Sequence, residues 1–126
     1  MCEIFKIRLS ESVQLDQARL DMLFSQLGDA GAQNVMCRAM EELAVRLSQC
    51  DTLWRAQNKM QLRKHARSLI AIADQIGMAT LARTAGDVTD CIDIRDDVAL
   101  AATLSRMLRI GERSLAAVWS MENLSL

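Results

Sequence analysis

The sequence contains no proline and no tyrosine, and only five of its 126 residues are glycine. Aromatic residues together make up 3% of the chain. An all-β sandwich or barrel of this length would need many turn residues and many aromatic or β-branched strand formers. The most frequent residues instead are Ala, Leu and Arg, which together with Met and Gln are good helix formers. The composition therefore predicts an all-α protein.

Excess charge of either sign is also absent. Fifteen basic and sixteen acidic side chains leave a formal net charge of −1. A balanced chain exerts no global attraction on nucleic acid or on an anionic membrane, so we expect neither as a partner. With 51% apolar residues the chain can bury a core, and its length suits one domain, which we expect to span residues 1–126.

Targeting and metal-binding signals are missing as well. The first ten residues lack the apolar run of a secretory signal, and no stretch approaches the 18 apolar residues of a membrane span. The four cysteines form no CxxC pair, and the single histidine lies far from a zinc-type spacing with any of them. We therefore expect a cytoplasmic protein with reduced thiols, no metal and no cofactor.

Apolar residues recur every three or four positions along most of the chain, which is typical of amphipathic helices. The predicted helices span about residues 13–27, 32–54, 59–76, 78–92 and 96–119. Gly28 and Gly77 are expected to end helices, and Gly31 is expected to keep the first connection flexible. Long helices joined by short loops must be antiparallel neighbours. We predict an antiparallel up-down four-helix bundle, with the first helix lying across one end.

The predicted core of this domain runs from about residue 16 to residue 119. Residues 1–10 form an arm that alternates apolar and charged side chains, and both an extended arm and a helical turn fit that pattern. Residues 121–126 are expected to fray. Several side chains are expected to pack in the core or close its ends. They are Met22, Leu27, Met36, Cys37, Met40, Val45, Cys50, Trp54, Met107 and Trp119.

The third helix and its exit carry the most specific signal. An ordered, gap-free series runs through Ser68, Leu69, Ala73, Gly77 and Leu81. This series resembles the signature of the histidine-containing phosphotransfer (HPt) domain family, which reads His-Ser-Leu-Lys-Gly-Ser-Ala, three residues, Gly, and Leu four positions later. The likeness extends over about residues 16–118. It implies a helical bundle that serves a two-component phosphorelay, with a response-regulator receiver domain or a histidine kinase as partner.

The chain departs from this signature at the chemically important positions. Arg67 stands where the family has its phosphorylated histidine, Ile70 where it has lysine, and Ala71 where it has glycine. A guanidinium stays protonated at neutral pH and offers no nucleophilic nitrogen. The resemblance therefore implies the fold and the partner class without the phosphoryl-carrying residue.

His65 is the only histidine that could take over this role. At about 100° per residue, it lies roughly 160° around the helix from Arg67, on the shoulder of the expected core. A phosphoacceptor must be exposed for in-line attack on an aspartyl phosphate, and His65 is poorly aimed for that. We expect a packed or half-buried side chain, and we keep His65 as the candidate phosphoacceptor of an alternative hypothesis.

The exposed side of the same helix, which we call the basic face, is the predicted docking surface. Its residues are Arg63, Lys64, Arg67, Ile70, Ala71, Asp74 and Gln75. A plain solvated helix face has the same composition. In the related family this face binds receiver domains, whose active end is acidic, and Arg67 can pair with a carboxylate or phosphoaspartate in a bidentate contact.

Three hypotheses follow from these observations. The first is a non-enzymatic HPt-like module that binds a receiver domain or a histidine kinase and regulates it by docking. The second is an active phosphotransfer protein that uses His65. The third is a structural or dimeric helical bundle with HPt likeness in fold only, for which a homodimer is the partner that the sequence permits.

Overall fold

The computed structural model describes residues 15–125, with side chains for residues 15–120. This part of the chain is all-α, as predicted, and contains no strand. Its helices are α2 (Gln17–Arg55), α3 (Lys59–Gln75), α4 (Ala79–Asp93) and α5 (Asp97–Ser125). The predicted arm at residues 1–10 lies outside the described residues. The backbone of α5 continues to Ser125, into the tail that was predicted to fray.

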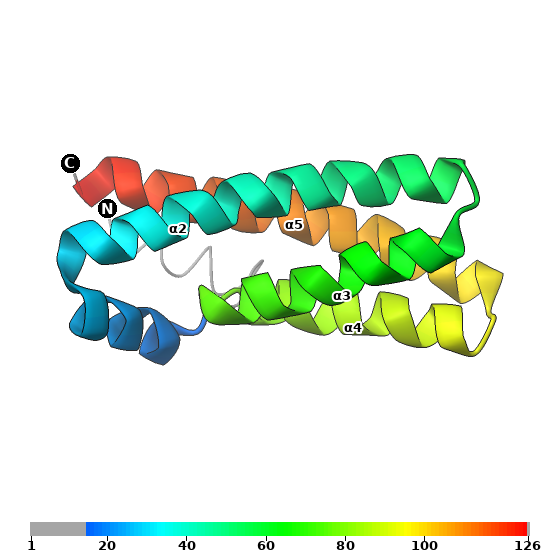
Figure 1. Cartoon of the computed structure of the whole chain (residues 1–126), viewed down its shortest axis with the longest axis horizontal. Coiled ribbons are helices and arrows are strands. Elements are labelled where there is room, and N and C mark those ends of the chain that lie inside the picture. Colours follow the sequence, from blue (N-terminus) through cyan, green and yellow to red (C-terminus); the bar gives the residue numbers. More distant parts are fainter. Residues whose placement is uncertain (1–14, 126) are drawn as a thin grey trace.

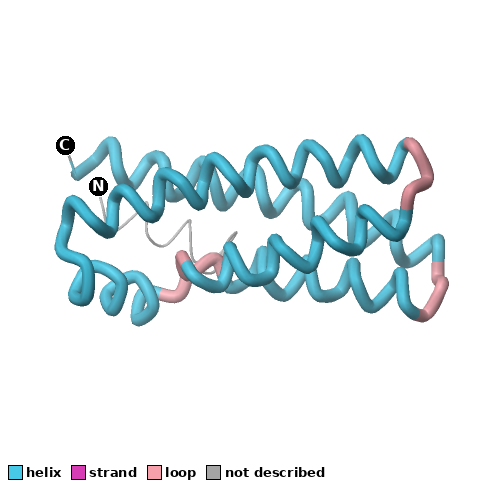
Figure 2. The backbone as a smooth tube through the Cα atoms, in the orientation of Figure 1, coloured by secondary structure: helices cyan, strands magenta, loops and turns pink. Residues whose placement is uncertain are grey.

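Short loops join helices that lie along one common axis (Figure 1). The long part of α2 and α5 form one side of the molecule, and α3 and α4 form the other. Helices that follow one another in the sequence run in opposite directions, and the connections between them are at the ends of the molecule (Figure 2). Helix α3 packs against α2 and α4, and α5 packs against α4 and α2.

Helix α2 contains a sharp bend at Gly28. The backbone there adopts φ 74° and ψ 170°, which lies outside the helical region and suits glycine. The residues before the bend fold back beside the end of α3 (Figure 1). The expected end of the first helix therefore coincides with this bend. The prediction of a flexible connection at Gly31 is wrong, because the helix resumes directly after Gly28 and includes Gly31.

Gly77 fixes the start of α2 against the α3–α4 loop. The backbone nitrogen of Asp16 donates a hydrogen bond of 2.6 Å to the carbonyl of Gly77. Gly77 has φ +78°, and a Cβ atom at this position would lie 2.8 Å from the carbonyl oxygen of Asp16. The Asp16 carboxylate also caps α2 by accepting from the amide of Arg19. Only glycine allows this close approach.

One continuous apolar core runs between the helices. Most of the predicted stripe residues are buried in it, including Met36, Met40, Cys50 and Met107, and Trp54 packs on its edge. Other residues expected in the core or at its ends are exposed instead: Met22, Leu27, Cys37, Val45 and Trp119. Periodicity was misleading for these residues because they lie on helix flanks that no further helix covers.

Helices α2 and α5 approach one another closely at Gly111. This glycine is buried in α5, and a Cβ atom on it would lie 2.5 Å from Cδ1 of Leu47. The absence of a side chain therefore lets α2 pack directly on the α5 backbone. Within residues 15–125, no helix combines the length and hydropathy needed to cross a bilayer.

Candidate functional site

Helix α3 exposes the basic face because the opposite side of the helix is buried in the core. Asn58 caps the helix by accepting a 3.2 Å hydrogen bond from the amide of Gln61. Four residues at helical spacing, Leu62, Ala66, Leu69 and Ala73, are completely buried. The positions on the opposite side of the helix therefore face outward. Of the predicted docking residues, Lys64, Arg67, Ala71, Asp74 and Gln75 are exposed, and Arg63 and Ile70 are half-buried.

Arg63 is held by an acidic residue of the neighbouring helix. Its Nε and Nη2 atoms donate hydrogen bonds of 2.7 Å and 3.0 Å to the two carboxylate oxygens of Asp93, at the end of α4. These hydrogen bonds hold the pKa of Asp93 below its ordinary value, and the charges of Arg63 and Arg67 act in the same direction. They also raise the pKa of Arg63. Arg63 is thus less available for docking than the sequence suggested.

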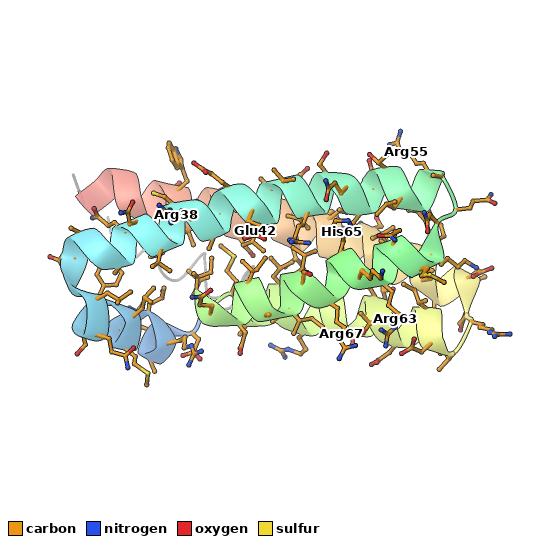
Figure 3. All side chains as sticks on the ribbon, in the orientation of Figure 1. Arg38, Glu42, Arg55, Arg63, His65 and Arg67 are labelled. Atoms are coloured by element: carbon orange, nitrogen blue, oxygen red, sulfur yellow. The ribbon has the colours of Figure 1, made fainter. Side chains whose placement is uncertain are left out.

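Arg67 is exposed and has no such partner. Among the described residues it forms no hydrogen bond and no ion pair, so its guanidinium keeps all its donors for solvent or a ligand. Figure 3 shows Arg63 and Arg67 on the same side of α3, away from α2. The two arginines therefore differ in their contacts: Arg63 pairs with Asp93 of α4, and Arg67, like the exposed Lys64, is available on the basic face.

His65 points to the other side of α3, toward α2 (Figure 3). The half-buried ring lies with its Nδ1 atom 3.2 Å from Nη1 of Arg46, and Arg46 in turn pairs with Glu42 at 3.0 Å. Desolvation by burial, followed by the charge of Arg46, lowers the pKa of His65. The ring is therefore neutral at physiological pH.

The Arg46 contact also determines the tautomer of His65. A guanidinium can only donate, so Nδ1 must accept with its lone pair, and the single proton of the neutral ring is on Nε2. In this arrangement the nucleophilic nitrogen is engaged by Arg46, and the other nitrogen carries a proton. The pattern within α3 gave no sign of this contact, because Arg46 lies on a different helix, 19 residues away.

A second surface feature lies between α2 and α5, outside the basic face. An open, mostly apolar hollow of about 420 Å³, which we call the α2–α5 groove, is lined by Cys37, Met40, Glu41, Ala44, Leu115, Ala116 and Trp119. Its lining explains why Cys37 and Trp119 are exposed. Among the described residues, no cluster of histidine, cysteine or acidic side chains is arranged to hold a metal ion.

Comparisons of this chain with protein-family models, with curated proteins and with solved structures found no match.

Proposed function

We propose that this protein is an HPt-like signalling module without a phosphoacceptor histidine. It binds a receiver domain or a histidine kinase of a two-component phosphorelay and regulates that partner by occupying its docking surface. The observation that carries this proposal is Arg67, an exposed and unpartnered cation at the centre of the basic face. The proposal includes the fold: an up-down four-helix bundle of the HPt type, with the segment before Gly28 lying across one end, in a single cytoplasmic domain.

The chemistry of the basic face suits an acidic partner. Arg67 can offer two parallel N–H donors to a carboxylate or a phosphoaspartate, which is the geometry that guanidinium groups bind best. Beside it, the small side chain of Ala71 leaves room for the partner's backbone, and Ile70 supplies apolar contact. The Arg63–Asp93 pair joins α3 to α4 beside this surface.

Phosphotransfer through His65 is the alternative that the geometry favours less. Attack on an aspartyl phosphate needs a free lone pair on an exposed ring nitrogen. The Nδ1 lone pair of His65 accepts from Arg46, and the half-buried ring faces α2. Arg67 has no such contact and is exposed, so it can bind a partner directly. Docking without phosphotransfer is therefore the better hypothesis.

The test is binding to a panel of receiver domains and histidine kinases from the same genome, with Arg67→Glu as the decisive variant. Loss of a hydrogen-bonded charge pair costs about 1.5–3 kcal/mol, so the dissociation constant should rise by about ten-fold or more. Arg106→Glu is the matched control, because Arg106 is exposed on α5 and the substitution changes the net charge equally.

Radiolabel transfer in the same panel separates the hypotheses. Binding that Arg67→Glu abolishes and Arg106→Glu preserves, without label on this chain, supports docking. Label that disappears in His65→Ala would show an active phosphotransfer protein instead. Equal binding by both charge variants would exclude the basic face, and the absence of any binding would leave the structural or dimeric bundle.

A further inference from the structure

The first part of α2, residues 17–27, is a separate packing unit, which we call the α2 flap. It folds back from the bend at Gly28 and lies beside the end of α3 (Figure 1). Its inner side packs on the common core through Leu20, which is buried, and through Leu23 and Phe24, which are half-buried. The flap therefore has one apolar side, and the bend brings that side onto the core.

The flap closes the core at the α3–α4 loop. Leu20 lies against Gly77, where a Cβ atom would be 3.3 Å from Cγ of Leu20. Asp16, directly before α2, donates its backbone hydrogen bond to the carbonyl of Gly77. Ile76 and Met78, on either side of Gly77, are completely buried. Detaching the flap would therefore open this end of the core to water and uncover the apolar side of the flap itself.

The bend is needed because the two parts of α2 have their apolar sides in nearly opposite directions. Leu20 precedes Met36 by 16 residues, which at about 100° per residue is a rotation of roughly 160°. Leu23 precedes Leu43 by 20 residues, which again gives roughly 160°. In a straight α2, the apolar side of the flap would point away from the core to which Met36 and Leu43 belong. A flap in that position can be buried only by a second core.

Gly28 keeps α2 bent through its backbone alone. Its φ of 74° and ψ of 170° lie in a region that essentially only glycine adopts. Among the described residues, a Cβ atom on Gly28 would meet no side chain within 4 Å apart from its chain neighbours. The residues on both sides of Gly28 are helical, so a change in the dihedral angles of this one residue converts the bent helix into a straight one.

We propose that two copies of this chain exchange their α2 flaps. In the exchanged dimer α2 runs straight through Gly28, and the apolar side of each flap packs on the α3–α4 end of the other copy's core. Each flap fits that surface because the contacts are the same ones that the bent monomer makes within one chain. Gly28 sets the balance between the two forms, since glycine tolerates the bend. The proposal is independent of the proposed function, because the flap and the basic face share no residue.

Gly28→Ala tests this balance. Alanine disfavours the bend through its backbone without a clash, and it favours the straight helix over glycine. Both copies gain in the exchanged dimer, so the dissociation constant should fall by about a hundred-fold or more relative to the parent chain. Sedimentation equilibrium over a range of protein concentrations measures this change, and circular dichroism checks that the variant keeps its helices.

Gly86→Ala is the matched control for the dissociation constant. It makes the same chemical change inside α4, where the nearest atom to the new Cβ is 4.0 Å away. Because Gly86 is far from the bend in the sequence and already helical, this variant should dimerise no more tightly than the parent chain.

Paired spin labels distinguish flap exchange from association through another surface. Met22 and Val45 are exposed on opposite sides of the Gly28 bend, and they take the labels as Met22→Cys and Val45→Cys in a chain with Cys2→Ser and Cys37→Ser. In a straight α2 the two positions are about 35 Å apart, which is the largest separation that the helix allows. The Gly28→Ala dimer, diluted with unlabelled chain, should show this distance by pulsed electron paramagnetic resonance, and the parent monomer should show a shorter one.

A second pair of labels is the control for this distance. Arg38 and Thr52 are both exposed on the part of α2 after the bend. Labels introduced by Arg38→Cys and Thr52→Cys should stay about 21 Å apart in monomer and dimer alike.

Three results would overturn the proposal. If Gly28→Ala dimerises no more tightly than Gly86→Ala, Gly28 does not set the balance. A dimer that keeps the short distance between positions 22 and 45 would show that the copies associate through another surface, such as the α2–α5 groove. If the 35 Å distance appears in Gly28→Ala monomers and no dimer forms, the flap opens without binding a second copy.

Discussion

Replacing Gly111 with alanine tests how closely α2 and α5 pack. On helix propensity alone, the substitution should stabilise the protein by about 1 kcal/mol. The new Cβ, however, would lie 2.5 Å and 2.9 Å from the two Cδ atoms of Leu47 and 3.3 Å from its Cγ. Because Leu47 is buried in the core, its whole branched end must move against its neighbours. Such overpacking costs about 1–3 kcal/mol, so we expect Gly111→Ala to lower the free energy of unfolding by up to about 2 kcal/mol.

Gly86→Ala is the matched control, since it makes the same change inside a neighbouring helix. The nearest atom to a Cβ at Gly86 is Cδ1 of Ile70, at 4.0 Å, which is an ordinary contact. The propensity gain is therefore retained, and this variant should be more stable than the parent by about 0.5–1 kcal/mol. We therefore expect the same glycine-to-alanine substitution to destabilise the protein at position 111 and to stabilise it at position 86.

Urea unfolding followed by circular dichroism measures both differences in the free energy of unfolding. In thermal unfolding, each 1 kcal/mol corresponds to a shift in Tm of about 4 °C for a chain of this size. Adding Leu47→Ala creates the space that the new Cβ at position 111 needs. The loss caused by Gly111→Ala should therefore shrink or reverse in the Leu47→Ala background. If Gly111→Ala stabilises the protein as much as Gly86→Ala, the close contact between Leu47 and the α5 backbone does not exist, and the reasoning is refuted.

The remaining predictions concern Gly77, His65 and Cys50. Gly77→Ala forces a side chain onto a backbone with φ +78° and against the Asp16 carbonyl, so we expect a loss of about 2 kcal/mol or more in urea unfolding; an unchanged midpoint would contradict the contact. The pKa of His65 is lowered below its ordinary 6.5, so the unfolded chain binds more protons just below that pH, and the free energy of unfolding falls as the pH drops through this range. The free energy of unfolding of the His65→Gln variant should fall less between pH 7 and pH 5; an identical pH profile would be evidence against a half-buried, Arg46-facing ring. Burial raises the pKa of Cys50 to about 12, so native protein at pH 8 should leave this thiol unmodified by a disulfide reagent that reacts with it in urea.

Much of the candidate site follows from local pattern. The 3.6-residue period of α3 determines that Leu62 and Leu69 face the core and that Arg67 faces outward, whichever helices supply the core. The absence of proline and tyrosine, and the spacing of apolar residues, likewise determine the all-α class and the approximate helix ends. These features need only neighbours within one or two turns, so the sequence by itself determines them.

Other features depend on residues that are distant in the sequence. Periodicity grouped Arg63 with Arg67, but Asp93, thirty residues away, pairs with Arg63 and leaves Arg67 available. Periodicity placed His65 at the edge of the core. Only the packing of α2 on α3 brings Arg46 to Nδ1 of His65 and so determines the tautomer of the ring. Cys37 and Trp119 match an apolar stripe and are nevertheless exposed, because α2 and α5 leave a groove between them. A helix pattern tells which way a side chain points, and only the tertiary structure decides what it meets there.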